Sequence, residues 1–261
     1  MRQYSFMNHG RRKRNLLAGG SAIALVVALC LWALVTRSAS ILQAASSTTA
    51  THGTYTTNFP LTENPISEGG KWINGQKDGV DWTDVRTTPG LAFGTEIGGN
   101  RRELEKYDDS TALLTGTWGP NQTAQATVRR VNKDPVGNST REVELRLRSA
   151  IAPHNATGYE VMFSCSKSAK AYTNIARWDG ILGAWMFLQK NEGPKFGVKD
   201  GDVIKASMIG KVFTVWVNGV KIAQTADYLF TSGNPGIGFY QEGVTGGSDQ
   251  CGLSNFTATD K

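Results

Sequence analysis

The sequence predicts an antiparallel β-sandwich preceded by one apolar segment long enough to span a membrane. From residue 58 onward, short apolar runs alternate with Gly, Asn, Asp and Pro, and no long stretch has a helical period. This pattern is typical of a sandwich or barrel. About ten strands are expected. They are residues 111–114, 123–131, 142–149, 159–164, 171–178, 185–189, 203–209, 212–226 as a hairpin, 236–241 and 252–257.

The hairpin of residues 212–226 shows the pattern most clearly. Its first run, VFTVWV, alternates apolar side chains with Thr214 and Trp216, as in a half-buried strand. Asn218-Gly219 follows, and this pair favours a type I′ turn because both residues take positive φ readily. The expected pairs are Val217 with Val220, Val215 with Ile222, and Trp216 with Lys221.

Residues 16–35 form an apolar segment of 20 residues that is interrupted only by Ser21. As a helix this segment would rise ~30 Å, the thickness of a bilayer core. The basic run at residues 11–14 should keep residues 1–15 in the cytoplasm, which places the rest of the chain outside. A cleaved signal peptide is the alternative, with Ser38-Ala39-Ser40 as the best cleavage pattern, and the protein would then be secreted.

Residues 38–57 are rich in Ser, Thr and Ala without a sustained apolar period, which predicts a solvated stalk. We assign residues 36–54 to the stalk and residues 55–261 to the sandwich. Six of the 28 basic residues lie in the first 37 positions, where no acidic residue occurs, and the other 22 balance the 22 acidic ones. The sandwich therefore lacks the concentrated cationic charge of nucleic-acid-binding domains.

Four stretches carry a resemblance to a known superfamily. They read NIARWDGILGAW, GDVIKASMIGKVFTVWVNGVKIAQ, SGNPGIGFY and CGLSNFTATD. They are similar to laminin-G-like and related bacterial domains of the concanavalin A-like lectin/glucanase superfamily. The resemblance covers residues 55–261 and implies a jelly-roll sandwich with a concave sheet that often holds carbohydrate. It does not imply one activity, because the superfamily includes lectins, hydrolases, lyases and adhesion modules.

The catalytic motif of the laminarinase-like hydrolases is incomplete here. Those enzymes carry E-x-D-x-x-E on one strand, whereas residues 142–147 read EVELRL and supply no third carboxylate. We also expect Arg146 and Arg148 to lower the pKa values of Glu142 and Glu144, the wrong direction for a general acid.

Other catalytic and metal motifs are also missing from the sequence. The Gln-x-His strand of alginate-lyase-like members is absent, and the three histidines are too scattered for a triad or zinc cluster. No cofactor is expected. Asp200-Gly201-Asp202 and Asp108-Asp109 offer oxygens for calcium, but such turns are common without metal.

Aromatic and polar side chains indicate a glycan ligand. Tyr172, Asn174 and Trp178 share one face of a strand, where an exposed indole stacks on a sugar ring and polar groups bind its hydroxyls. In the competing interpretation, Trp178 packs at the sandwich edge, as we expect for Trp185. For Glu144 and Arg146 the alternative is a solvated face with ion pairs. The full candidate set is Trp178, Asp179, Asn174, Tyr172, Tyr240, Glu144 and Arg146.

Cys165 and Cys251 are the two cysteines outside the apolar segment. In an oxidising compartment such a pair favours a disulfide, here between the end of one strand and the start of the last. Two buried free thiols are the alternative.

Together these features predict a membrane-tethered, extracytoplasmic module that binds a polysaccharide or other glycan, or acts in adhesion, without catalysis. The alternative is a polysaccharide-active hydrolase or lyase with an unfamiliar site such as Glu144, Arg146 and Tyr240.

Overall fold

The computed structural model describes residues 53–76, 82–95, 109–131, 140–181, 183–242 and 248–261. They belong to one compact unit, Ala50–Lys261. Within these ranges no helix is long and apolar enough to cross a bilayer. The predicted membrane segment, residues 16–35, lies outside the described residues, so the structure does not test it.

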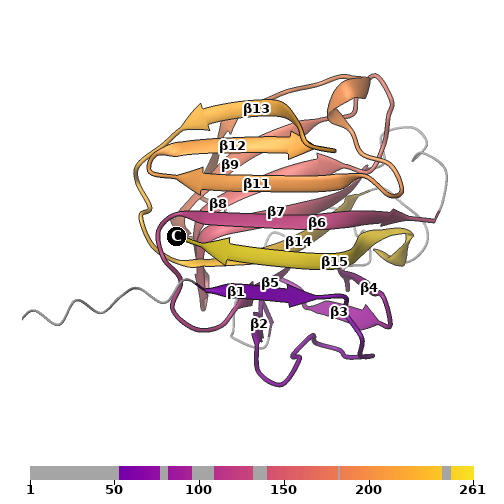
Figure 1. The fold of residues 1–261 in the computed structure, drawn as a ribbon, viewed down its shortest axis with the longest axis vertical. Coiled ribbons are helices and arrows are strands. Elements are labelled where there is room, and N and C mark those ends of the chain that lie inside the picture. Colours follow the sequence, from indigo (N-terminus) through magenta and orange to yellow (C-terminus); the bar gives the residue numbers. More distant parts are fainter. Residues whose placement is uncertain (1–52, 77–81, 96–108, 132–139, 182, 243–247) are drawn as a thin grey trace, which may run out of the picture. The chain divides into compact units, whose positions relative to one another are not determined.

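Two antiparallel sheets face each other and form the sandwich (Figure 1). The eight-stranded sheet has the order β13-β12-β11-β6-β15-β4-β3, and β1 also pairs with β15. Its strands are β1 (Thr54–Thr57), β3 (Val85–Thr88), β4 (Leu91–Gly94), β6 (Gln122–Arg130), β11 (Val203–Ile209), β12 (Val212–Val217), β13 (Val220–Ala226) and β15 (Cys251–Asp260).

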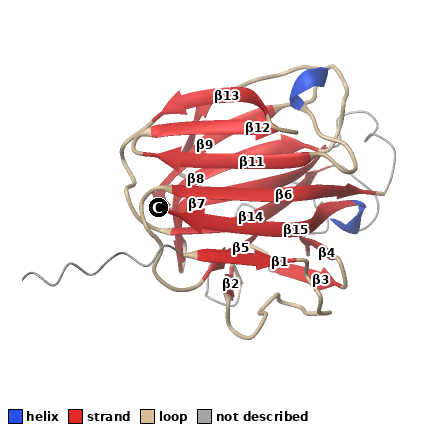
Figure 2. Cartoon of the chain, in the orientation of Figure 1, coloured by secondary structure: helices blue, strands red, loops and turns tan. Residues whose placement is uncertain are grey.

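The seven-stranded sheet has the order β10-β9-β8-β7-β14-β5-β2. Its strands are β2 (Trp72–Asn74), β5 (Ser110–Leu114), β7 (Thr140–Ala152), β8 (Asn155–Ser164), β9 (Thr173–Ile181), β10 (Trp185–Gln189) and β14 (Asn234–Glu242). The helical elements of the described residues are two short 3₁₀ turns, Pro194–Phe196 and Ser248–Gln250 (Figure 2). The predicted all-β sandwich is confirmed.

The core between the sheets is built by side chains that alternate along the strands. Val143, Leu145 and Leu147 of β7 are fully buried there, as are Phe213 and Val215 of β12. Burial of such side chains contributes about 1.5–3 kcal/mol each, which is the main force holding the two layers together. The same alternation turns the intervening residues of β7, β8 and β9 to the opposite face of the seven-stranded sheet.

The Asn218-Gly219 hairpin forms as predicted at its tip and shifts register farther along. Val217 pairs with Val220 and Trp216 with Lys221, and both turn residues have positive φ. A bulge between Val215 and Trp216 then pairs Val215 with Ala223 rather than with the expected Ile222. A bulge inserts one extra residue on one strand, which a turn motif does not predict.

Four strands lie in the part of the sequence where none was predicted. β1, β2, β3 and β4 have three or four residues each, too few for a periodic signal. β1 pairs along β15, so the end of the Thr-rich segment is part of the sandwich rather than stalk. Gly53 and Gly119 both donate backbone hydrogen bonds to Asp260, which joins the start of this strand to the last one.

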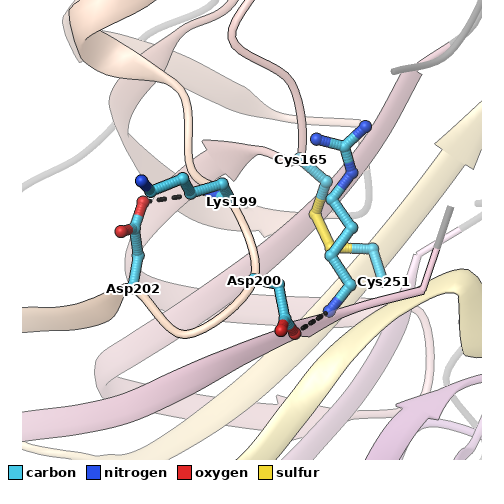
Figure 3. Close-up of a disulfide and its surroundings, with 6 residues drawn as sticks. Cys165, Lys199, Asp200, Asp202 and Cys251 are labelled. Carbon is cyan, nitrogen blue, oxygen red and sulfur yellow. Dashed lines mark hydrogen bonds between the residues drawn. A yellow bond between two sulfur atoms is a disulfide. The ribbon is translucent and has the colours of Figure 1, made fainter. Parts of the chain in front are cut away.

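Cys165 and Cys251 form the predicted disulfide (Figure 3). Cys165 follows the last residue of β8, and Cys251 is the first residue of β15. The two strands belong to different sheets, so the bond links the layers covalently across 86 positions of sequence.

A second link between the layers is polar. The Tyr159 hydroxyl, from β8, donates to Asp227 just after β13 at 2.6 Å, and Arg177 of β9 donates to the same carboxylate at 2.5 Å. Burial and the hydrogen bond to Asp227 raise the pKa of Tyr159 to about 12. The pKa of Asp227 is lowered, since hydrogen bonds from Tyr159 and Arg177 outweigh its burial.

Candidate functional site

The face of the seven-stranded sheet that points away from the core, called the outer face below, collects most of the predicted site residues. Arg146 of β7 lies opposite Glu160 of β8, and Glu144 lies opposite Met162. Asn174 is paired with Met162 on the far side, in β9. Their alternating neighbours are all in the core, so these side chains share the outer face.

Three of the other four predicted residues also reach the outer face. Trp178 lies on the outer face of β9, and Tyr240 of β14 is paired with Glu142 of β7. Tyr172, just before β9, hydrogen-bonds to the Glu142 side chain and so reaches the same face. Asp179 does not join them, because its carboxylate accepts a 2.5 Å hydrogen bond from Arg177, whose position in β9 alternates with that of Trp178.

A buried ion cluster forms the centre of the outer face. Arg146 donates to Glu144 at 2.7 Å and lies 2.8 Å from Glu160, and the three side chains are only 1–2% exposed. Asp109 is 3.7 Å from the same guanidinium. The Trp82 ring covers the cluster, with its centroid 4.6 Å from the Arg146 guanidinium carbon. Of the alternative for Glu144 and Arg146, the cross-strand ion pair forms, between Arg146 and Glu160, but the face is buried rather than solvated.

Glycine makes room for this cluster. Gly238 of β14 is paired with Glu144, and a Cβ at position 238 would overlap the Glu144 carboxylate and come within 3.1 Å of Arg146 Nε. The two side chains thus fold over the backbone of the neighbouring strand. Any larger residue at position 238 would displace the ion pair.

Burial raises the pKa values of Glu142 and Glu144 well above their ordinary range. After burial, the nearby carboxylates of Asp109 and Glu160 raise the pKa of Glu142 further, and the Arg146 guanidinium lowers it too little to compensate. The expectation that arginine would lower these pKa values is wrong for two reasons. Transfer of a carboxylate out of water outweighs one cation shared by several acids, and Arg148 is not nearby.

Arg148 is turned away from the acids by a bulge in β7. The register shifts between Leu147 and Ala150, and Arg148 has a φ of 48°. Its guanidinium donates to three backbone carbonyls instead, those of Pro120, Phe230 and Gly210. Period-two counting along β7 cannot anticipate this reversal.

Glu142 is the acid of this face whose hydrogen bonding is incomplete. Its side chain is buried, and Oε2 has no hydrogen-bond partner among the described residues. The Tyr172 hydroxyl bonds to the same carboxyl group, and burial followed by the Glu142 charge raises the pKa of Tyr172 well above 10. A neutral carboxyl group next to a neutral phenol is the arrangement that these shifts favour.

Arg146 supplies the positive charge inside the acidic cluster. Carboxylate oxygens of Asp109, Glu144 and Glu160 lie within 4.8 Å of one another, a spacing that a metal ion can bridge. The Arg146 guanidinium lies among these oxygens, and it fills the role that a cation would have.

In the other oxygen-rich turn, Asp200-Gly201-Asp202, both carboxylates accept hydrogen bonds from the protein (Figure 3). Asp200 accepts from the backbone NH of Arg130 at 2.8 Å, and Asp202 accepts from the backbone NH of Lys199 at 3.0 Å and from Asn218 Nδ2 at 2.9 Å. These bonds hold the turn before β11. Asp108, the other calcium candidate, lies outside the described residues.

Trp178 is buried rather than exposed. Its side chain is 6% exposed and packs with Trp82 at 4.8 Å between ring centroids, and Nε1 donates to Glu160 at 2.6 Å. The indole that reaches solvent is the neighbouring Trp185, which pairs with Trp178 from the edge strand β10 and is 41% exposed. The interpretation of Trp178 as an exposed stacking surface is therefore wrong. Trp185 packs at the sandwich edge as expected, and part of its ring is also exposed there.

The exposed Trp185 and the half-buried Phe187 form an aromatic pair, called the aromatic platform below. Their centroids are 4.6 Å apart in an edge-to-face arrangement, and Trp185 also contacts Trp178 at 5.9 Å. Lys190 Nζ lies 4.1 Å from the Phe187 ring centroid. In the sequence WMFLQ, Trp185 and Phe187 are two positions apart, so they project on the same face of the strand. This spacing is the sequence feature that indicates the platform, which the edge position of β10 leaves accessible.

Comparison with known proteins identifies the fold and not a function. No protein-family model matches the chain, and no curated protein is similar to it in sequence. The metal-free carbohydrate recognition domain of Emp46p is 11% identical with a TM-score of 0.50, covering 78% of this chain and 95% of that domain.

Two bacterial proteins align with lower scores. The β-glucanase of Bacillus licheniformis is 9% identical, with a TM-score of 0.48 and coverage of 80% and 98%. The carbohydrate-binding module CBM66 from Bacillus subtilis is 16% identical, with a TM-score of 0.47 and coverage of 71% and 98%. At these identities the likeness concerns the fold alone. The two facing antiparallel sheets are those of a concanavalin A-like jelly roll, the lectin-like and glucanase-like fold that the sequence resemblance implies.

Proposed function

We propose that this protein is a glycan-binding module held to a membrane outside the cytoplasm, and that its ligand stacks on Trp185 and Phe187. The observation that carries the proposal is the division of the outer face into a closed part and an open part. The ion cluster is closed to solvent, whereas Trp185 at the edge is exposed and Phe187 beside it is half-buried. An exposed indole next to a second ring offers the flat apolar surface on which sugars stack.

Polar groups next to the platform supply the hydrogen bonds that a sugar requires. Asn174 is half-buried on the same face, two positions from Ala176, which pairs with Phe187, and Lys190 is exposed beside Phe187. The buried cluster supports the platform from behind, because Trp178 is fixed by Glu160 and in turn contacts Trp185. A rigid support of this kind reduces the entropy lost when a ligand binds.

A polysaccharide hydrolase is the second candidate, and a specific observation favours it. Glu142 and Glu144 lie on the same face of β7, and burial gives both raised pKa values, as a general acid requires. Two observations weigh against it. Both carboxyl groups are buried, and Leu147 occupies the position of the third acid in the strand motif.

One experiment separates the two candidates. Residues 50–261 are applied to a glycan array, and each glycan that binds is then incubated with the protein while reducing ends are measured. The proposal expects binding without release of sugar. Release that is lost in Glu142→Gln or Glu144→Gln would establish the hydrolase instead, and no binding to any glycan would contradict both.

The membrane tether rests on residues 16–35 and on the basic run before them. The Cys165–Cys251 bond supports a location outside the cytoplasm, where disulfides persist. Membrane fractionation followed by protease treatment of intact cells tests the tether. Fragments of the sandwich released into the medium are expected, and N-terminal sequencing that begins near Ser38 would show a cleaved signal instead.

A further inference from the structure

A series of hydrogen bonds connects Gly53, the first described residue, with the loop after β13, and it marks one end of the sandwich. Gly53 accepts from the backbone NH of Asp260, and Lys261 donates to Asn121. Asn121 accepts in turn from the backbone NH of Gly210. The next residue, Lys211, accepts a hydrogen bond from the backbone NH of Asp227. Gly53 and Asp227 therefore lie at the same end of the molecule. We call it the entry end.

The entry end exposes apolar side chains at neighbouring positions. Tyr228 and Leu229, directly after Asp227, are 82% and 53% exposed. Arg177 joins this loop to β10, because it donates to Asp227 at 2.5 Å and to the sulfur of Met186 at 3.3 Å. Met186 is itself exposed.

The turn that connects β9 to β10 adds a further apolar residue. Ile181, the last residue of β9, is 73% exposed and accepts a hydrogen bond from Ala184. Ile181, which lies four positions beyond Arg177 in β9, is thus a further exposed apolar residue at this end; Ile181, Met186, Tyr228 and Leu229 together are called the entry-end patch. A clustered patch of this kind indicates an interaction, whereas single exposed apolar residues do not.

The length of chain before Gly53 indicates what covers the patch. Residues 36–52, 17 in number, separate the apolar segment from the entry end. Seventeen residues reach at most about 60 Å when fully extended. Gly53 lies at the same end as the patch, so a bilayer that held residues 16–35, as proposed above, would be within reach of Tyr228 and Leu229.

We propose that the entry-end patch docks onto the surface of the lipid bilayer, with Tyr228 and Leu229 inserted at the headgroup level. The inference rests on the tether proposed above. Tyrosine and aliphatic side chains suit this interface because the ring is amphipathic and the aliphatic groups enter the acyl boundary. Four side chains suffice because the tether gives an effective concentration on the order of millimolar.

The docked orientation leaves the aromatic platform accessible. The entry end is formed by the ends of strands of both sheets, so docking through it would turn the outer face away from the bilayer rather than against it. Trp185 and Phe187 project on that face, whereas Met186 between them projects with Arg177 toward the other. Docking would thus fix the direction in which the platform points.

The test uses the full chain in lipid nanodiscs of phosphatidylcholine and phosphatidylglycerol. Cys30 is replaced by Ser, the disulfide is left oxidised, and a nitroxide is attached to Tyr228→Cys. The matched control is Val220→Cys, which is 65% exposed at the opposite end of the same strand region, roughly 20 Å away. Collision with oxygen, which concentrates in lipid, is compared with collision with a water-soluble nickel chelate.

The label at position 228 should be at least about threefold less accessible to the nickel chelate than the label at 220, and more accessible to oxygen. A label at Ile181→Cys should behave like the one at 228, and Leu229→Asp should abolish the difference. Equal accessibility at 228 and 220 in protein that is inserted in the discs would overturn the docking alone. Failure of the chain to enter the discs would overturn the tether, and the docking with it.

Discussion

Arg146 Nη1 lies 2.8 Å from Glu160 Oε2, with both side chains 2% exposed and the two residues directly paired across β7 and β8. The same carboxylate oxygen accepts the Trp178 indole NH. One buried ion pair therefore connects the acidic cluster to Trp178, which in turn contacts Trp185 of the aromatic platform.

Removal of the arginine from this cluster should destabilise the protein strongly. Arg146→Leu leaves Glu144 and Glu160 buried without their cation, and the loss of one partner of a buried pair costs about 3–5 kcal/mol. Urea unfolding of residues 50–261 measures the loss. Arg129→Ala is the control, because its pair with Asp200 at 3.4 Å is about half-exposed, so that a loss under about 1 kcal/mol is expected. Equal losses in the two variants would show that the cluster does not depend on its charge pairing.

Stability should fall as pH rises above the ordinary carboxyl range. The pKa values of Glu142 and Glu144 are raised from 4.5 by burial, so the folded state retains protons that the unfolded state releases. Their contribution is complete below about 4.5 and is lost as pH rises through the folded values, at up to about 1.4 kcal/mol per pH unit for each proton.

Glu142→Gln should make this pH profile shallower, because glutamine does not titrate. Urea midpoints between pH 5 and pH 8, measured for both proteins, provide the comparison. The lowered pKa of Asp227 has the opposite sign, but it acts only below its ordinary value of 3.8 and does not interfere. Parallel profiles for the two proteins would contradict the assignment of a buried proton to this site.

Reduction of the disulfide should destabilise the sandwich by about 4–5 kcal/mol, the loop-entropy value for a closed loop of 86 residues. The double variant Cys165→Ser and Cys251→Ser, compared with oxidised protein by urea unfolding, measures this loss. Non-reducing mass spectrometry serves as the check on the starting material. Two alkylatable thiols in native protein would show that the bond is absent.

Trp178 and Trp185 should differ sharply in their effect on stability. Trp178 is buried against Trp82 and hydrogen-bonded to Glu160, so Trp178→Ala should cost about 3–5 kcal/mol. Trp185→Ala removes a half-exposed ring from an edge strand, and a loss under about 1 kcal/mol is expected. Similar losses would mean that Trp185 is a packing residue after all.

Local pattern predicts much of this fold. The Asn218-Gly219 turn, the alternation of β7 and the bounds of β10 and β11 follow from periodicity and turn chemistry, which act between neighbouring residues. The bulges at Arg148 and Val215 do not, because each depends on the strand alongside. The short strands β1 to β4 are set by long-range pairing as well.

The candidate site is less predictable than the fold for a physical reason. Alternation correctly assigns Glu144, Arg146 and Trp178 to one face, but it does not say what covers that face. Trp82 and Asp109, which come from distant parts of the chain, close the centre. Burial then reverses the expected pKa shifts and moves the solvent-exposed indole from Trp178 to Trp185.

Glycan affinity of Trp185→Ala is the most direct test of the central proposal. Residues 50–261 of the native and variant proteins are titrated with the best glycan from the array, and thermal unfolding of each is recorded. Loss of a stacked indole typically costs on the order of 1–3 kcal/mol of binding. The proposal predicts at least about tenfold weaker binding with a nearly unchanged melting temperature. Unchanged affinity in a stable Trp185→Ala protein would contradict it.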